Sequence, residues 1–130
     1  MPKRIMIIDD DNELCLALRE MLESEGYEIQ TAGDIGRADK VIQHTAFDMV
    51  LLDLKLPGDS LAFLKRMKSK DPEHKILIIS ASRLVEMNET QTINKEEKHN
   101  INILKLANGI VRKPFDPENL IQMIKQMIYD

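Results

Sequence analysis

The sequence has little of what would place it outside the ordinary globular class. It contains one cysteine, no tryptophan and only 4% aromatic residues. One cysteine cannot form an internal disulfide, and with so few aromatics the core has to be filled by aliphatic side chains and the eight methionines. No apolar run is long enough for a signal sequence or a membrane span. We therefore expect a cytoplasmic protein that does not contact a membrane.

Basic residues are also in the minority. The 18 lysines and arginines are outnumbered by 22 aspartates and glutamates, which gives a formal net charge of -4. Direct binding of nucleic acid is not expected, because phosphate recognition needs a basic surface. At 130 residues the chain has the length of one domain with one core, so we expect residues 1–130 to form a single unit.

What the chain does have is a regular alternation of apolar runs and amphipathic patterns. The expected strands are residues 4–8, 27–32, 50–53, 75–79 and 109–111. The first expected helix begins at a capping box of Asp10 and Glu13 and ends at Gly26, and the next two cover residues 34–44 and 60–70. A fourth helix is expected to begin at a cap formed by Asn94 and Glu97 and to turn Ile101, Leu104 and Ala107 inward. The fifth begins at Pro117. This alternation predicts an α/β fold with a parallel sheet covered on both faces.

Polar side chains follow four of these strands. They are Asp9, Asp10 and Asp11 after the first, Asp53 at the end of the third, Ser80 after the fourth, and Arg112 and Lys113 after the fifth. In an open α/β sheet the carboxyl ends of the strands meet at the ligand site, so these groups should converge.

Their chemistry suggests a metal and a phosphoryl group. Two carboxylates about 4 Å apart repel by roughly 4 kcal/mol at an effective dielectric near 20, so Asp9, Asp10 and Asp53 together call for a cation. Oxygen-only ligands favour Mg²⁺. Lys113 and the Ser80 hydroxyl suit phosphoryl oxygens, and an aspartate can itself form an acyl phosphate. Each feature alone is more often a turn or a helix cap, and it is the combination that carries this interpretation.

The segments IMIIDDDNEL, VLLDLKLPG, ILIISAS and GIVRKPF together resemble the receiver domain of two-component response regulators over essentially the whole chain. The resemblance implies a flavodoxin-like, doubly wound sheet of five parallel strands in the order 2-1-3-4-5, with five helices. It also implies that Asp53 accepts a phosphoryl group from a histidine kinase or a phosphotransfer histidine. A downstream protein would then bind the face made by the fourth helix, fifth strand and fifth helix.

The same resemblance assigns roles within the site. Asp10, Asp53 and the backbone carbonyl of Lys55 would bind Mg²⁺, with Asp9 acting mainly through water. Lys113 would contact the phosphoryl oxygens, and Ser80 would move toward them as a switch. Lys55 and Ser82 would flank the acyl phosphate and tune its lifetime. The bond from Lys113 to Pro114 resembles the cis peptide of the family.

Three departures from the family pattern concern signal transmission. The loop after Asp53 is one residue short, with Ser60 near a position that is often glycine. Ile110 replaces the usual aromatic switch. The polar stretch between Ser80 and Gly109 is longer than usual. We interpret it as a solvated loop with a shifted fourth helix, and a partner-specific surface is the alternative.

Two other functions remain open. Asp9 and Asp11 fit half of the motif of haloacid-dehalogenase-type phosphatases, but Glu13 departs from it and no length is left for a cap domain. A receiver-like scaffold that works without phosphorylation is the other alternative. We expect no enzyme activity beyond self-phosphorylation and self-dephosphorylation.

Several other side chains receive structural interpretations. Cys15 is expected in the core of the first helix. The three histidines, His44, His74 and His99, lack metal-ligand spacing and are expected at the surface. Ile121 falls at the edge of the apolar stripe of the last helix and would allow at most a weak homodimer contact.

Overall fold

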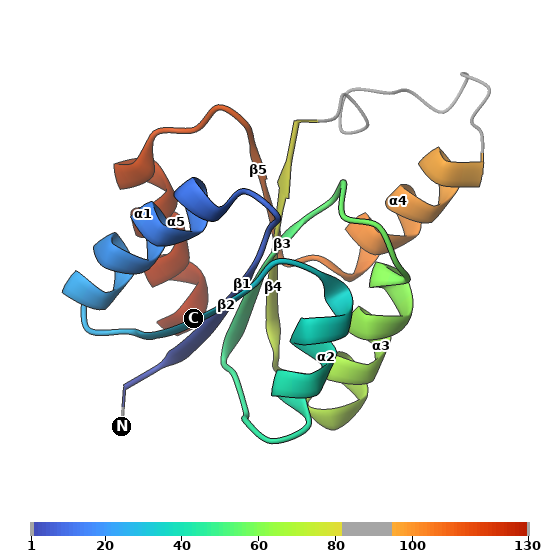
Figure 1. Ribbon diagram of the computed structural model, residues 1–130, viewed down its shortest axis with the longest axis horizontal. Helices are drawn as coiled ribbons and strands as arrows, with labels where there is room; N and C mark the ends of the chain where they lie inside the picture. The colour runs from blue at the N-terminus through green and yellow to red at the C-terminus, as the bar shows by residue number, and fades with distance from the viewer. Residues whose placement is uncertain (1, 82–94, 130) are drawn as a thin grey trace.

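The computed structural model describes residues 2–81 and 95–129 of the 130-residue chain. Strands and helices alternate throughout these residues (Figure 1). The strands are β1 (Arg4–Ile8), β2 (Glu28–Ala32), β3 (Met49–Asp53), β4 (Lys75–Ser80) and β5 (Gly109–Arg112). The helices are α1 (Asn12–Ser24), α2 (Ile35–Ile42), α3 (Ser60–Lys70), α4 (Lys95–Leu106) and α5 (Pro117–Tyr129). Ser82 and Asn94, named above for roles at the site and at a helix cap, lie outside the described residues.

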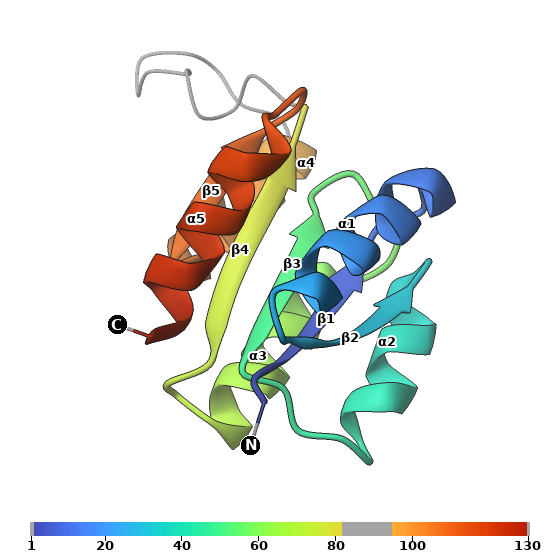
Figure 2. The ribbon, with the colours of Figure 1, turned by 90° about the vertical axis from the view of Figure 1, so that its left-hand side faces the viewer.

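All five described strands form one parallel sheet in the order β2-β1-β3-β4-β5. α1 and α5 cover one face, and α2, α3 and α4 cover the other (Figures 1 and 2). The predicted doubly wound fold and its strand order are therefore confirmed. The order places β1, β3 and β4 inside the sheet, so the chain segments that leave their carboxyl ends emerge side by side.

The three central strands, β1, β3 and β4, are buried as their apolar sequences predict. Every residue of β3 is buried, and Val50, Leu51 and Leu52 have no exposed surface. Such continuous apolar runs are typical of parallel strands that have helices on both faces. The core accordingly forms two clusters of buried side chains, one on each side of the sheet. No helix among the described residues is long and apolar enough to cross a membrane.

Aspartates begin three of the helices. Side-chain oxygens of Asp11, Asp34 and Asp59 accept hydrogen bonds from backbone N–H groups in the first turns of α1, α2 and α3, at 3.1, 2.8 and 3.0 Å. The predicted cap at Asp10 is wrong by one residue, because Asp11 has the extended backbone of an N-cap and the helix starts at Asn12. This shift leaves Asp10 uncommitted to the helix and available to the strand-end site.

Two helix faces differ from their predictions. Among the described side chains of α4 the most buried is Ile103, at 1% exposure, whereas Ile101 and Leu104 are only partly buried. Ile103 joins the cluster under α2 and α3, which sets the rotation of the helix. On α5, Ile121 is buried in the second cluster rather than left at the edge of the stripe. The predicted dimer contact through Ile121 therefore loses its basis.

Candidate functional site

The polar strand ends are aligned by backbone hydrogen bonds that continue the sheet beyond the strands. The N–H of Asp9 donates to the carbonyl of Ala32 at 3.1 Å, and the N–H of Leu54, next to Asp53, donates to that of Ile79 at 3.0 Å. The N–H of Lys113 donates to the carbonyl of Ser80 at 2.9 Å. Each site residue therefore occupies a position fixed by a neighbouring strand rather than by a free loop.

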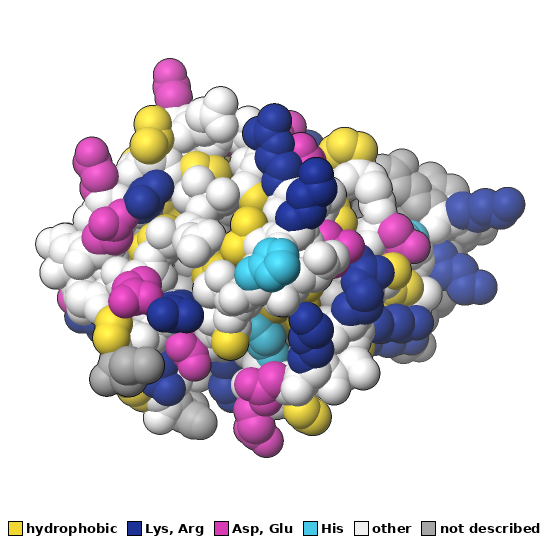
Figure 3. Space-filling model, turned by 60° about the horizontal axis from the view of Figure 1, so that its bottom comes forward, with side chains coloured by type: hydrophobic (Ala, Val, Ile, Leu, Met, Phe, Trp, Pro, Cys, Tyr) yellow, Lys and Arg dark blue, Asp and Glu magenta, His cyan; other side chains and the backbone are white. Residues whose placement is uncertain are grey.

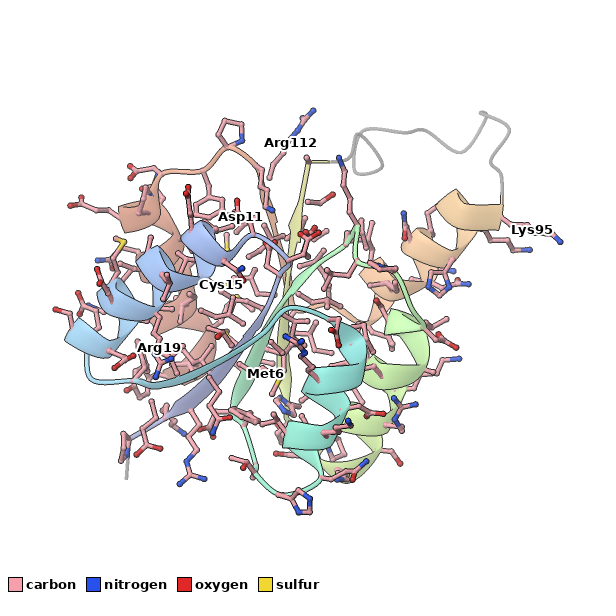
Figure 4. The ribbon with its side chains drawn as sticks, in the orientation of Figure 1. Met6, Asp11, Cys15, Arg19, Lys95 and Arg112 are labelled. Atoms are coloured by element: carbon pink, nitrogen blue, oxygen red, sulfur yellow. The ribbon has the colours of Figure 1, made fainter. Side chains whose placement is uncertain are left out.

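Three carboxylates meet at this edge. One oxygen from each of Asp9, Asp10 and Asp53 lies within 4.8 Å of the other two. Asp9 and Asp53 are buried, at 1% and 5% exposure, whereas Asp10 is exposed. The cluster thus has a covered floor and one side open to solvent. Figure 4 shows Asp11 at the start of α1 on the same edge as Arg112 at the end of β5.

Lys113 supplies the positive charge of the cluster. Its ammonium lies 3.0 Å from Oδ2 of Asp9 and 3.7 Å from Oδ2 of Asp53. Burial lowers the pKa of Lys113, but the hydrogen bond with Asp9 and the charge of Asp53 outweigh that effect and hold the pKa above its usual value. Lys113 is therefore a permanent cation that touches both buried acids.

Asp53 is the least favourably placed of the charged groups. Burial raises its pKa, the N–H of Lys55 lowers it by donating to Oδ1 at 3.1 Å, and the charge of Asp9 raises it again. The net direction is upward. Its carboxylate is thus oriented by the backbone but incompletely neutralised, and a further cation or a reaction that spreads its charge would relieve it.

The remaining predicted residues have different relations to the cluster. Ser80 is buried and ends β4 beside Lys113, to which it is joined through its backbone carbonyl. The Lys55 side chain is exposed. Lys55 lies on the loop after Asp53, and its backbone N–H donates to Oδ1 of Asp53. The Lys113 to Pro114 peptide is cis, as predicted. The structure thus brings Asp9, Asp10, Asp53 and Lys113 together and places Ser80 and Lys55 next to them.

Two features of the site were not predicted. Lys113 pairs first with Asp9, because Asp9 has no exposed side-chain surface and needs a counter-ion. Cys15 donates from Sγ to the carbonyl of Asp9 at 3.4 Å, although its assignment to the core is confirmed. The sequence carries no clear signal for the first, since Lys55 and Lys113 both lie two residues after an expected strand.

The donor set fits Mg²⁺. Its three closely spaced oxygen donors include two buried ones that are not fully neutralised by one lysine. Mg²⁺ is usually held by one or two carboxylates with water molecules and phosphate oxygens completing the shell, and the open side at Asp10 leaves room for them. Among the described residues, no histidine or cysteine joins this group to favour a softer metal.

Curated relatives cover part of the chain. Sporulation initiation phosphotransferase F of Bacillus subtilis is 35% identical over 82 residues, which are 62% of this chain and 66% of that protein. The alginate biosynthesis transcriptional regulatory protein AlgB of Pseudomonas syringae pv. tomato is 34% identical over 84 residues, 64% of this chain but 19% of that protein. The match thus spans less than two thirds of the length of either relative.

Solved structures match more of the chain. A CheY-like response regulator receiver domain protein from Methanospirillum hungatei superposes with a TM-score of 0.78 and 26% identity, covering 98% of this chain and 94% of that one. A two-component response regulator from Clostridium difficile gives 0.76 and 25%, covering 98% and 96%. The family model of the response regulator receiver domain matches residues 5–125. Because this match covers nearly the whole fold, including the acids at the strand ends, the chain belongs to the response regulator receiver domain family.

Proposed function

We propose that Asp53 is the phosphoacceptor of this receiver domain and that residues 1–130 act as one signalling unit. The observation that carries the proposal is the position of Asp53 at the end of the fully buried β3, with a carboxylate oxygen 3.7 Å from Lys113 and close to two further acids. Asp9 is also buried and accepts from a backbone N–H, that of Asp11. Asp53 differs in that burial raises its pKa and that its contact with Lys113 is the longer one.

The transfer balances with the groups present. A carboxylate oxygen of Asp53 attacks the phosphorus of a phosphohistidine, the P–O bond forms as the P–N bond breaks, and the donor imidazole leaves and takes up a proton from solvent. Lys113 neutralises charge on the phosphoryl oxygens as they arrive. Asp9 and Asp10 do not compete as acceptors, because Asp9 is held by Lys113 and Asp10 is an exposed carboxylate without a fixed partner among the described residues.

The proposed metal ligands are Asp9, Asp10 and Asp53, with the Lys55 carbonyl as a further donor and water between Asp9 and the ion. Bound there, Mg²⁺ would supply the positive charge that allows an anionic phosphoryl group to approach three carboxylates. Asp10 is the natural direct ligand because it is exposed and carries no cap or ion pair among the described residues.

Phosphorylation would reorganise the contacts of Lys113. The phosphoryl group adds close to two negative charges beside an ammonium that already lies 3.0 Å from Asp9 and 3.7 Å from Asp53. Lys113 would shift toward the phosphoryl oxygens and loosen its contact with Asp9. The Ser80 carbonyl accepts from the N–H of Lys113, so the two switch residues are directly connected. A movement of Ser80 would be transmitted to the segment that follows it, and residues 82–94 of that segment lie outside the described residues.

The proposed donors are a sensor histidine kinase or a histidine phosphotransfer protein, which implies a cytoplasmic setting because the kinase uses ATP. The proposed output is a protein bound on the face of α4, β5 and α5. Ile110 of β5 is partly buried against the core beside α4, where an aromatic switch would be expected to move. Ile110 cannot act as an aromatic switch, so in this proposal the downstream protein responds to a movement of α4 itself.

The proposal is tested by intact-mass analysis after incubation with acetyl phosphate and Mg²⁺. The expected result is one phosphoryl adduct that requires Mg²⁺ and is absent from Asp53→Asn. Asp59→Asn is a matched control that removes an aspartate on the same loop, where it caps α3, and it should keep the adduct. A folded protein that takes up no phosphoryl group would instead favour the phosphorylation-independent scaffold. Catalytic release of phosphate from phosphoesters would favour a phosphatase.

A further inference from the structure

The turn between α3 and β4 carries a histidine that is packed into the core. His74 is 5% exposed, so its expected position at the surface was wrong. Its side chain lies beside the buried side chains of Phe47 and Met67. Histidines, lysines, arginines and acids appear together at this end of the molecule (Figure 3). The turn lies at the opposite end of the parallel strands from Asp53, because β4 begins at Lys75 whereas β3 ends at Asp53.

One ring nitrogen of His74 has no partner. Its Nδ1 is buried and forms no hydrogen bond among the described residues. A neutral imidazole carries one N–H group, whereas the protonated ring carries one on each nitrogen. Protonation in this position therefore buries a charge and leaves a donor at Nδ1 without an acceptor, and both effects cost stability. The closed turn thus favours the neutral ring.

The charged groups around the ring only partly offset its burial. Burial lowers the pKa of His74 and is the strongest influence on it. The charges of Asp71 at the end of α3 and Asp48 before β3 raise the pKa, whereas Lys68 of α3 lowers it. A hydrogen bond to the backbone of Lys75 also raises it, and the net direction is downward. The other titratable side chains near the turn are those of His44, Lys70, Glu73 and Lys75.

The backbone of the turn is linked to the end of α4 through one ammonium group. The carbonyl of His74 accepts a hydrogen bond from Nζ of Lys68, and the same Nζ donates to Oδ1 of Asn108 at 3.3 Å. Asn108 lies between α4 and β5 and pairs with β4, since its Oδ1 accepts from the N–H of Ile76 at 2.9 Å and its own N–H donates to the carbonyl of Ile76 at 2.8 Å. A displacement of the turn therefore changes a contact of Asn108.

We propose that protonation of His74 opens the α3–β4 turn and that Lys68 transmits the opening to Asn108 at the end of α4. This gives the domain an acid-sensitive input at the end of the sheet that is remote from Asp53. The input does not rest on phosphorylation, but it reaches the helix through which a downstream protein is proposed to respond.

The balance between the closed and the open turn depends on pH. Above the ordinary value of 6.5 the ring is neutral in both forms, so the closed turn keeps its full stability. Below 6.5 the ring of the open form takes up a proton while that of the closed form does not, and the balance moves toward the open form. The movement ends once the pH has fallen through the lowered pKa of the closed form.

Amide hydrogen exchange of the unphosphorylated protein, corrected for the intrinsic exchange rate, tests the proposal between pH 7 and pH 5. The N–H of Lys75, which donates to the carbonyl of Asp48 at 3.2 Å, reports on the turn, and the N–H of Asn108 reports on the end of α4. The protection of both should fall by about threefold or more over this range, whereas Leu51 in the centre of β3 should stay protected. Constant protection of Lys75, or an equal loss at Leu51, would overturn the proposal.

Two variants identify the titrating group. His74→Leu fills the position with an apolar side chain that does not titrate, so the protection of Lys75 should become independent of pH between 7 and 5. His44→Gln removes an exposed histidine close to the same turn and should keep the wild-type profile. A pH dependence that persists in His74→Leu, or that disappears in His44→Gln, would contradict the role of His74.

A further pair of variants tests the link to α4. Lys68→Met keeps a long side chain but removes the ammonium that joins the turn to Asn108. Acid should still open the turn in this variant, but the protection of Asn108 should no longer follow that of Lys75. Lys65→Met, on the exposed side of the same helix, should leave both profiles unchanged. Parallel profiles for the two amides in Lys68→Met would refute the transmission.

The ring protons of His74 give a readout that needs no variant. Followed by NMR as the pH is lowered, they should titrate with a midpoint below 6.5, because burial lowers the pKa of His74. Asp53→Asn should show the same titration, so a failure of the phosphoacceptor assignment would not affect this result. A midpoint at or above 6.5 would contradict the burial of a neutral ring.

Discussion

Asp53→Asn is expected to stabilise the unphosphorylated, metal-free protein. A carboxylate oxygen of Asp53 lies no more than 4.8 Å from one of Asp9, which corresponds to a repulsion of at least about 3.5 kcal/mol at an effective dielectric of 20. Asp53 also lies 3.7 Å from Lys113, which corresponds to an attraction of about 4.5 kcal/mol. These terms nearly cancel. The sign of the stability change is then decided by the burial of the Asp53 carboxylate and by the further negative charge of Asp10. Both disfavour the ionised form of Asp53.

The asparagine keeps the size of the side chain and an oxygen that can accept from the N–H of Lys55. It removes only the charge. Relief of an incompletely compensated buried group is worth about 1–3 kcal/mol, so the free energy of unfolding should rise by that amount. The assay is urea unfolding at pH 7 in the presence of EDTA, with Glu20→Gln, an exposed change of the same charge, expected within about 0.5 kcal/mol of wild type.

The effect should depend on pH and on metal. Because the folded-state pKa of Asp53 is raised, its ionisation destabilises the fold above that pKa, and the penalty is lost as the pH falls toward the ordinary value of 3.8. The difference between Asp53→Asn and wild type should therefore shrink with falling pH. Added Mg²⁺ should also shrink it by stabilising the wild type more. A variant equally or less stable than wild type in EDTA at pH 7 would refute this reasoning.

Three further changes probe the site and its supports. Lys113→Met should lower the free energy of unfolding by about 2–4 kcal/mol in urea titrations, because it leaves the fully buried Asp9 without its counter-ion; an unchanged value would show that the pair contributes nothing. Cys15, whose pKa burial raises from 9.0 to about 11, should react with iodoacetamide about 100-fold more slowly at pH 8 in the native protein than in urea, and equal rates would contradict its burial. Gly26→Ala should cost about 1–2 kcal/mol because Gly26 has φ of +95°, whereas Gly33→Ala, with open space around its Cβ and no such φ, should be nearly neutral.

The fold was predictable because strands and helices have different apolar patterns in the sequence. Val50 to Leu52 form a short continuous apolar run, which is typical of a strand that is buried on both faces. The strand order could not come from such patterns and was obtained from the family resemblance. The helix starts were predicted less accurately. Asp10 and Asp11 are both able to cap a helix, and the sequence does not show that Asp11 is the one with the extended backbone and the side-chain bond to the N–H of Leu14.

The candidate site was predictable as a set of residues and not as a set of contacts. Polar residues after buried strands had to converge once the sheet was parallel. That Lys113 prefers Asp9 to Asp53 depends on which carboxylate is more completely buried, and local sequence does not encode it. The burial of His74 was missed for the same reason. A histidine after a proline turn reads as a loop residue, but here the loop folds against the core beside Phe47 and Met67.

The most direct measurement for the central claim is to locate the phosphoryl group within the chain. The protein would be phosphorylated with acetyl phosphate and Mg²⁺, reduced with borohydride to convert an aspartyl phosphate into homoserine, digested and sequenced by mass spectrometry. The account predicts homoserine at position 53, while Asp9 and Asp10 remain aspartate. Modification at either of those acids, or at none of the three in a folded and Mg²⁺-loaded protein, would contradict it.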